Sequence, residues 1–205
     1  MANVTNVKSK FFGAVDGLDA DGISTTASIS GAAALTINGT LASGGSYTSG
    51  DNIGQPITIT SAGDDEGITF TVVGTDAVGD AQTEVVTGAD TTVATSSGYF
   101  NTVASITTSA STAAAVTAGV TATGTGTVFA GRTRVRGMQG LSGASAGNLL
   151  FKNTSVTGTT LLTVPTQAAA ELIEPYIPDN GILFNAGAYV NFGSAVATVT
   201  VFYDG

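Results

Sequence analysis

The chain has 205 residues, a formal net charge of −9 with only 10% charged residues, and no Cys, His or Trp. Without Cys there is no disulfide framework and no thiol nucleophile, and without His the commonest general base and transition-metal ligand is missing. The length allows one large β domain or two small ones, each able to bury a core without cross-links.

The charges are unevenly distributed along the chain. The first 100 residues hold eleven acids and two lysines, whereas the remainder holds four acids, three arginines and Lys152. An acidic first half is expected to repel nucleic acid and anionic membranes. No apolar run approaches the roughly 20 residues of a membrane span, and Gly13, Asp16 and Asp19 interrupt the N-terminal apolar stretch, so we predict no signal peptide. We therefore expect neither a nucleic-acid partner nor a membrane partner.

The first 30 residues lack a clean periodicity and are rich in small polar residues and Asp. They predict an N-terminal arm or linker over 1–30, with a short strand near residues 10–15. Phe11 and Phe12 follow two lysines and are its one strongly apolar point. They could pack on a neighbouring subunit or on their own domain.

Residues 31–124 have the pattern of a first β-sandwich domain. Residues 57–60 and 68–72 alternate Ile, Phe or Val with Thr, as expected of strands with one buried face. Seven or eight such short strands at regular spacing predict an antiparallel sandwich.

Residues 125–205 predict a second, smaller sandwich. We expect a strand over 127–136, a loop over 137–147 and a turn or two of helix between Pro165 and Pro175. The closing strand, 196–203, is apolar on both faces near its end, which favours a place inside a sandwich or at a subunit contact. The predicted fold is therefore all-β, with two small antiparallel β-sandwich domains of jelly-roll or Ig-like type after an N-terminal arm.

Three arginines form the one cationic cluster of the sequence. Arg132, Arg134 and Arg136 are spaced by two and therefore lie on one side of a strand. Without interleaved aromatic residues they are a poor footprint for nucleic acid. Phosphate binding, an interface with acidic residues of a partner and a solvated strand face remain open.

Motifs for catalysis and metal binding are incomplete. Residues 143–147 match the G-x-S-x-G nucleophile elbow, but Ser145 has no His to activate it. The acids at 16–21 and 64–66 miss the spacing of a calcium loop. A carboxylate pair could hydrolyse glycosides, although no feature selects a pair among fifteen acids. We expect no enzyme activity, no metal and no cofactor, and noncatalytic sugar binding remains an alternative.

Two segments carry a resemblance to a known class of proteins. Residues 68–88, ITFTVVGTDAVGDAQTEVVTG, and 99–106, YFNTVASI, resemble a segment of virion structural proteins from tailed bacteriophages of marine and cyanobacterial hosts. The tail, GILFNAGAYV followed by VATVTVFYDG, is similar to the closing strands of small phage surface proteins. No catalytic residues are part of this resemblance.

The resemblance implies a noncatalytic virion component, found on the capsid surface as a decoration or cement protein. Its expected partners are other copies of itself, as a homotrimer, and the major capsid protein or other virion proteins. A neck, tail or fibre component is the alternative within the virion, and a bacterial surface or carbohydrate-binding protein is the alternative from another class. The residues predicted to make assembly contacts are Phe11, Phe12, Arg132, Arg134, Arg136 and Phe202.

Overall fold

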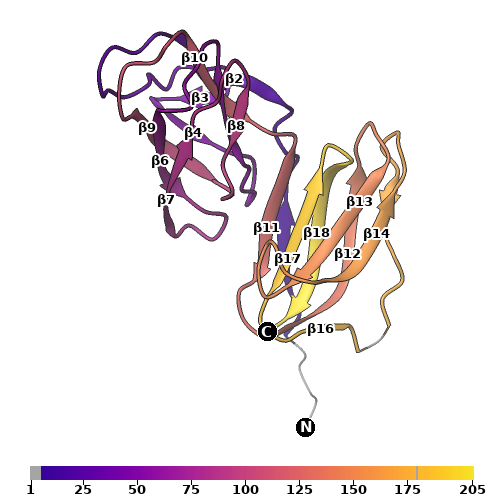
Figure 1. Ribbon diagram of the computed structural model, residues 1–205. Coiled ribbons are helices and arrows are strands. Elements are labelled where there is room, and N and C mark those ends of the chain that lie inside the picture. The colour runs from indigo at the N-terminus through magenta and orange to yellow at the C-terminus, as the bar shows by residue number, and fades with distance from the viewer. Residues whose placement is uncertain (1–5, 179) are drawn as a thin grey trace. The chain divides into compact units, whose positions relative to one another are not determined.

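The computed structural model describes residues 6–178 and 180–205, and all regular elements in this part of the chain are β-strands. The predicted all-β class is confirmed. The chain folds into two compact units (Figure 1). Unit 1 comprises the N-terminal segment up to Val15, Gly50–Ile53 and Thr123–Gly205, and unit 2 comprises Asp16–Ser49 and Gly54–Ala122.

Unit 1 has two antiparallel sheets. The first has the order β1-β18-β12-β15, with β16 also paired to β12, and the second has the order β11-β17-β13-β14. The first sheet contains β1 (Lys8–Phe12), β18 (Val196–Asp204), β12 (Thr133–Ser142), β15 (Leu172–Ile173) and β16 (Ile182–Phe184). The second contains β11 (Thr123–Phe129), β17 (Ala188–Gly193), β13 (Gly147–Asn153) and β14 (Thr160–Thr166).

Unit 2 also has two antiparallel sheets, with the orders β2-β10-β5-β8 and β3-β4-β9-β6-β7. The first contains β2 (Asp19–Ala27), β10 (Val116–Val120), β5 (Ile57–Ser61) and β8 (Val93–Thr95). The second contains β3 (Ala42–Ser43), β4 (Ser46–Thr48), β9 (Thr102–Thr108), β6 (Thr69–Thr75) and β7 (Ala81–Thr87).

Both units have the strand order of a jelly roll. When β15 and β16 together count as the sixth strand of unit 1, its sheets run 1-8-3-6 and 2-7-4-5 along the unit's own chain order. Unit 2 has the same two orders, with β3 added at one edge. Eight strands arranged as two Greek keys define the jelly roll. Of the two predicted sandwich types, jelly-roll and Ig-like, the strand pairing therefore supports the jelly roll.

The two jelly rolls are nested along the chain, because unit 2 lies between the first two strands of unit 1, β1 and β11. The predicted N-terminal arm is therefore wrong for the described residues. β1 pairs with β18 from Lys8↔Tyr203 to Phe12↔Val199, and β2 is the first strand of unit 2. The first five residues of the predicted arm lie outside the described chain.

Two smaller expectations for unit 1 are also wrong. The predicted loop over 137–147 is strand up to Ser142, because β12 continues through Gly137 and Gly140. A β-carbon at Gly140 would lie 2.5 Å from the backbone oxygen of Thr198 on the neighbouring strand, so glycine permits close strand contact here rather than a turn. The segment predicted as helix between Pro165 and Pro175 contains the short strand β15 instead.

Each unit has its own apolar core. In unit 1 the fully buried Phe12 packs edge-to-face on Phe192, with ring centroids 6.3 Å apart. The Phe12 ring occupies the space beside Gly126, where a β-carbon would lie 2.2 Å from a ring carbon. In unit 2 the core includes Tyr47 and Phe70. The alternating Ile, Phe and Val residues of the sequence thus point inward, as predicted.

A buried amide joins the two ends of unit 2. The side chain of Gln55 is fully buried, and its Nε2 donates hydrogen bonds to the backbone oxygens of Asp16 (3.1 Å) and Thr121 (2.7 Å). Its Oε1 accepts hydrogen bonds from the Asp16 amide (3.0 Å) and the Ser49 hydroxyl (3.1 Å). Asp16 begins unit 2 and Thr121 lies one residue before its end. Gln55 therefore clamps the points where the chain enters and leaves the inserted jelly roll.

Tyr47 gives unit 2 an expected sensitivity to alkaline pH. Burial raises the pKa of its hydroxyl, and the charge of Asp16, whose Oδ2 accepts the Tyr47 hydrogen bond at 2.9 Å, acts in the same direction. The unfolded chain loses this proton near pH 10, whereas the folded chain keeps it. The contribution of the protonated Tyr47 hydroxyl to the free energy of unfolding is therefore fully present below pH 10. Above pH 10 the free energy of unfolding falls by up to about 1.4 kcal/mol per pH unit.

Urea unfolding of unit 2 between pH 8 and pH 11 tests this expectation. The Tyr47→Phe variant is expected to start less stable, because it loses the bond to Asp16, and to decline less steeply above pH 10. Equal slopes for the two proteins would show that the Tyr47 hydroxyl does not control alkaline unfolding.

Candidate interaction surface

The outward side of the first sheet of unit 1 carries an apolar strip. Directly paired residues of neighbouring antiparallel strands point to the same side of a sheet, and the register pairs Phe11 with Thr200 and Phe202 with Gly137. The same register pairs Leu141 with Thr198 and with Leu172. We call this side the open face, and its members are Phe11, Gln139, Leu141, Leu172, Thr198, Thr200 and Phe202.

The apolar side chains of the open face are exposed, although the strands that carry them are paired with neighbouring strands. Phe11 is 42% exposed, Phe202 36% and Leu172 62%. A β-carbon at Gly137 would lie 3.7 Å from a ring carbon of Phe202, so this ring lies over the glycine and covers its strand. Several exposed apolar side chains on one side of a sheet that is already paired are typical of a contact surface.

Arginines lie at one end of the open face, although not in the regular row that their spacing predicts. A β-bulge between Val135 and Gly137 makes Arg136 an extra residue in β12. Arg136 Nε lies 3.2 Å from Asp204 Oδ2, and Arg134 Nη1 donates a hydrogen bond to the Asn180 backbone oxygen at 3.1 Å. The Arg136 pair is partly exposed and contributes less than about 1 kcal/mol to stability.

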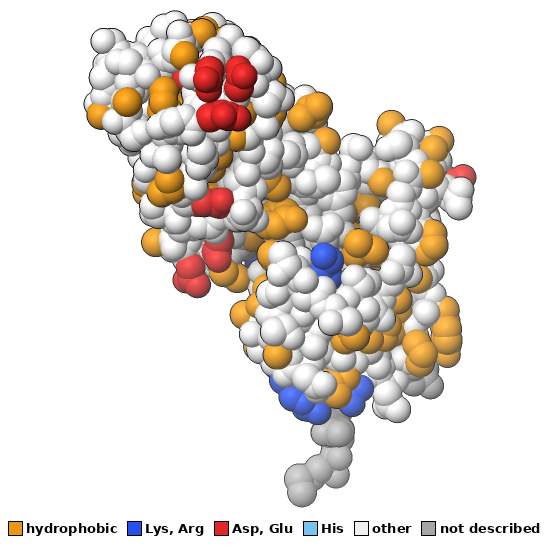
Figure 2. All heavy atoms as spheres, in the orientation of Figure 1, with side chains coloured by type: hydrophobic (Ala, Val, Ile, Leu, Met, Phe, Trp, Pro, Cys, Tyr) orange, Lys and Arg blue, Asp and Glu red, His pale blue; other side chains and the backbone are white. Residues whose placement is uncertain are grey.

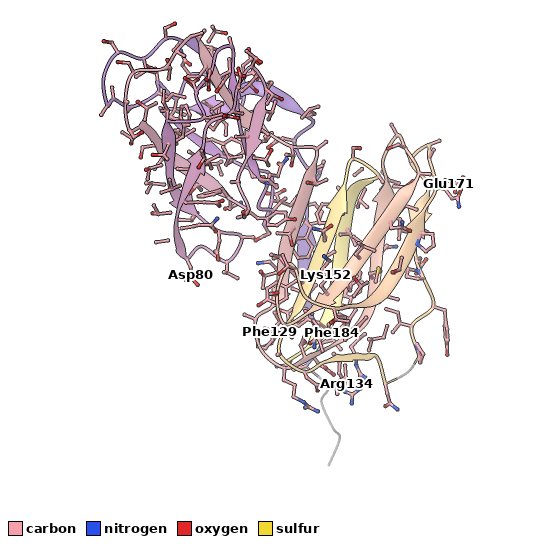
Figure 3. The ribbon with its side chains drawn as sticks, viewed as in Figure 1. Asp80, Phe129, Arg134, Lys152, Glu171 and Phe184 are labelled. Atoms are coloured by element: carbon pink, nitrogen blue, oxygen red, sulfur yellow. The ribbon has the colours of Figure 1, made fainter. Side chains whose placement is uncertain are left out.

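The figures show where this basic end lies within unit 1. Figure 2 shows blue side chains gathered at the end of the unit that holds the C-terminus, and Figure 3 labels Arg134 there. Lys8 belongs to the same end, because its Nζ donates a hydrogen bond to the Gly205 backbone oxygen at 2.8 Å and lies 5.7 Å from the centre of the Phe129 ring. Arg132 is exposed.

Five of the six predicted contact residues lie on or beside the open face. Phe11 and Phe202 lie on the open face, and Arg132, Arg134 and Arg136 lie at or beside its basic end. Phe12 is fully buried in the core of unit 1, so the prediction of an assembly contact at Phe12 is wrong. Sequence reasoning missed Leu141 and Leu172, because it assigned them to a loop and a helix.

The hollows beside the open face are small. One, of about 190 Å³, is lined by residues 132–134, Leu183, Asp204 and Gly205. Another, of about 230 Å³, lies between the segments 164–167 and 171–175. Sites for small molecules usually enclose about 300 Å³ or more. These hollows therefore do not have the size of a typical ligand pocket.

The candidate catalytic and metal motifs have ordinary structural roles. Ser145 lies in the turn between β12 and β13, so no helix follows it as a nucleophile elbow requires. Partial burial disfavours the charged form of Asp19, but hydrogen bonds from Thr40 and Asp21 outweigh this effect and lower its pKa. Among the described residues, no group of three or more Asp or Glu could hold a metal ion. The same part of the chain has no helix long and apolar enough to cross a membrane.

Comparison with known proteins adds no relative: no family model matches the chain, and neither a curated protein nor a solved structure matches it.

Proposed function

We propose that the protein is a noncatalytic structural component of a tailed-phage virion, which decorates or cements the capsid shell as a homotrimer. The open face of unit 1 carries the proposal, because it offers exposed Phe and Leu side chains on a rigid sheet. Contacts of this kind, repeated by symmetry over a shell, give high avidity even when each contact is weak. The resemblance of residues 68–88 and 99–106 to phage virion proteins supports the same role.

The nested jelly rolls are compatible with this role without identifying it. Jelly rolls occur in viral capsid proteins, but also in lectins and cupins, and a fold alone does not imply a function. The proposal therefore depends on the open face. In the proposed assembly, unit 1 attaches the protein to the capsid shell through the open face, and the acidic unit 2 is free to face solvent or another copy.

Binding of the purified protein to particles that lack it tests this proposal. The wild-type protein is expected to sediment with the particles and to saturate at a fixed number of copies. Phe11→Ser combined with Leu172→Ser removes two anchors of the open face and is expected to weaken binding about tenfold or more.

Leu161→Ser is the matched control, because Leu161 is 44% exposed on β14 in the other sheet of unit 1. This variant is expected to bind as the wild type does. Equal binding by all three proteins, or no binding by any of them, would contradict attachment through the open face.

A further inference from the structure

The strand β7 forms an edge of the second sheet of unit 2 and is not protected against pairing with another strand. A sheet edge presents a row of N–H and C=O groups, and proteins usually block it with short strands, Lys, Pro or bulges. β7 has seven residues and contains no Lys, Arg or Pro. It pairs with β6 without a register shift, from Thr69↔Thr87 to Thr75↔Ala81. Its outer edge is therefore regular and unblocked.

The other edge strands in the described part of the chain are short, bulged, charged or interrupted by Pro. β3 and β15 have two residues each, and β8 and β16 have three. β1 contains two lysines, and β14 contains Pro165. β2 and β11 pair with their neighbours through register shifts. The contrast with these edges marks β7 as an edge that is open to a further strand.

The register shows which backbone groups of β7 point outward. Gly88, directly after β7, donates its amide hydrogen to the Ile68 backbone oxygen at 2.8 Å. Hydrogen-bonded pairs alternate along an antiparallel ladder, so residues 82, 84 and 86 are the members of β7 that are bonded to β6. The N–H and C=O groups of the residues between them point away from β6, and these residues are Ala81, Thr83, Val85 and Thr87.

The outward backbone groups of β7 are accessible. All four residues that carry them are exposed, and Val85 is 58% exposed. Glu84 lies on the opposite side of the strand, where its carboxylate accepts hydrogen bonds from the amides of Ser97 and Gly98 at 2.6 and 2.8 Å. Within residues 6–178 and 180–205, no group is hydrogen-bonded to the outward N–H and C=O groups of β7. The edge can therefore accept a strand without breaking an existing bond.

The charge of unit 2 decides which kind of strand this edge accepts. All six lysines and arginines of the chain belong to unit 1, whereas unit 2 has ten carboxylates and no cation. Asp80, directly before β7, and Asp90, three residues after it, are both exposed, and Figure 3 labels Asp80. Like charges oppose pairing with β7 of a second copy, whereas a strand with Lys or Arg at its ends is attracted.

We propose that β7 binds an extended segment of a partner protein, about seven residues long with Lys or Arg at each end, as a sixth strand of its sheet. In this mode of recognition the backbone hydrogen bonds supply affinity, and side chains beside Thr83 and Val85 supply specificity. The inference goes beyond attachment through the open face, because β7 belongs to unit 2. Either proposal can fail without the other.

NMR of the isotope-labelled full chain with two peptides is the first test. One peptide alternates Thr and Val over five residues between a Lys at each end, with both termini blocked, and the other has Glu at each end instead. The Lys peptide is expected to shift the amide signals of β7 and to slow their hydrogen exchange. The Glu peptide is expected to bind about tenfold more weakly or less in about 50 mM NaCl, where charges are little screened.

Three outcomes of this titration would overturn the proposal. They are equal affinity for the two peptides, no binding of the Lys peptide at about 1 mM, and signal shifts centred away from β7.

A cation placed on β7 tests the position of the site. Val85→Lys gives the edge one of the devices by which proteins block strand pairing, and it is expected to weaken binding of the Lys peptide about fivefold or more. Val93→Lys is the matched control. Val93 is 48% exposed on β8 in the other sheet, and its neighbour Ala94 packs against the core, so Val93 points away from the core. Equal effects of the two substitutions would contradict a site at β7.

Thr83→Pro tests the role of the backbone. Proline removes the outward N–H of residue 83 but no hydrogen bond to β6, a position at which edge strands tolerate it. This variant is expected to weaken binding of both peptides about tenfold or more, and urea unfolding checks its fold. Unchanged binding would contradict recognition through the backbone of β7.

Sedimentation velocity without peptide examines a second copy as the occupant of the edge. Wild type and Thr83→Pro are expected to have the same oligomeric state. A smaller species for Thr83→Pro would assign the edge to a second copy and would overturn the proposal.

Discussion

Replacing Phe12 by Ala is expected to lower the free energy of unfolding of unit 1 by about 4 kcal/mol, within the range of Phe→Ala changes in protein cores. The ring is fully buried, packs on Phe192 and fills the space beside Gly126. β1 is an edge strand, and β18 is its one strand partner among the described residues, so the cavity would also loosen the first strand of the jelly roll.

Phe11→Ala is the matched control for this change. Phe11 is the preceding residue of the same strand, but it lies on the open face and is 42% exposed, so its loss is expected to cost less than about 1 kcal/mol. Urea unfolding gives the two free energies, and hydrogen exchange followed by peptide is expected to show faster exchange in β18 and β12 of Phe12→Ala. Similar effects of the two substitutions would contradict the placement of β1 in unit 1.

Replacing Gln55 by Leu is expected to destabilise unit 2 by about 3 kcal/mol. The substitution keeps a side chain of similar size but removes the hydrogen bonds to Asp16, Ser49 and Thr121, so the buried Ser49 hydroxyl and the partly buried Asp16 amide lose their acceptor, at about 1–3 kcal/mol for a buried group. The loss would release the two ends of the inserted unit from each other. Hydrogen exchange is expected to rise first in β2 and β10, the strands next to these ends.

Gln139→Leu provides the comparison, because Gln139 is an exposed residue of β12 in unit 1. It is expected to change stability by less than about 0.5 kcal/mol. If Gln55→Leu were as mild as Gln139→Leu, Gln55 would not be the clamp of unit 2.

The strands with regular alternation could be predicted from the sequence. Residues 57–60 and 68–72 alternate apolar residues with Thr, and the structure places strands β5 and β6 there. This works because alternation is a local property of a strand, although in β5 Thr58 and Ser61 are buried too. The local pattern of the sequence also changes near residue 124, and a segment of unit 1 begins at Thr123.

The nesting of the two units could not be predicted, because it depends on contacts between distant parts of the chain. β1 pairs with β18 at the opposite end of the sequence. Because β1 is a five-residue strand with two lysines, its local sequence does not identify the strand with which it pairs. The continuation of β12 beyond residue 136 could not be predicted either, and the reason is again physical. The bulge at Arg136 interrupts the alternation, and Gly137 and Gly140 resemble turn residues in the sequence, although Gly140 permits close contact between strands.

The candidate surface was partly visible in the sequence. Phe11, Phe202 and the arginines stand out in the sequence as apolar or cationic residues, and strand pairing brings the two phenylalanines to one side of a sheet. Phe12 was misassigned because adjacent residues of a strand point to opposite faces, and only the fold tells which face is the core. The separation of charge between the two units depends on the fold, because Asp51 and both N-terminal lysines belong to unit 1 although they lie in the acidic first half of the sequence.

Antibody labelling of intact phage particles, viewed by electron microscopy, tests the central claim most directly. If the protein decorates the capsid, label is expected to spread evenly over the heads, and to be absent from particles made without the protein. Label confined to one vertex or to the tail would contradict the decoration role and favour a neck, tail or fibre component. Absence of label from every particle would contradict a virion role altogether and favour a bacterial surface or carbohydrate-binding protein.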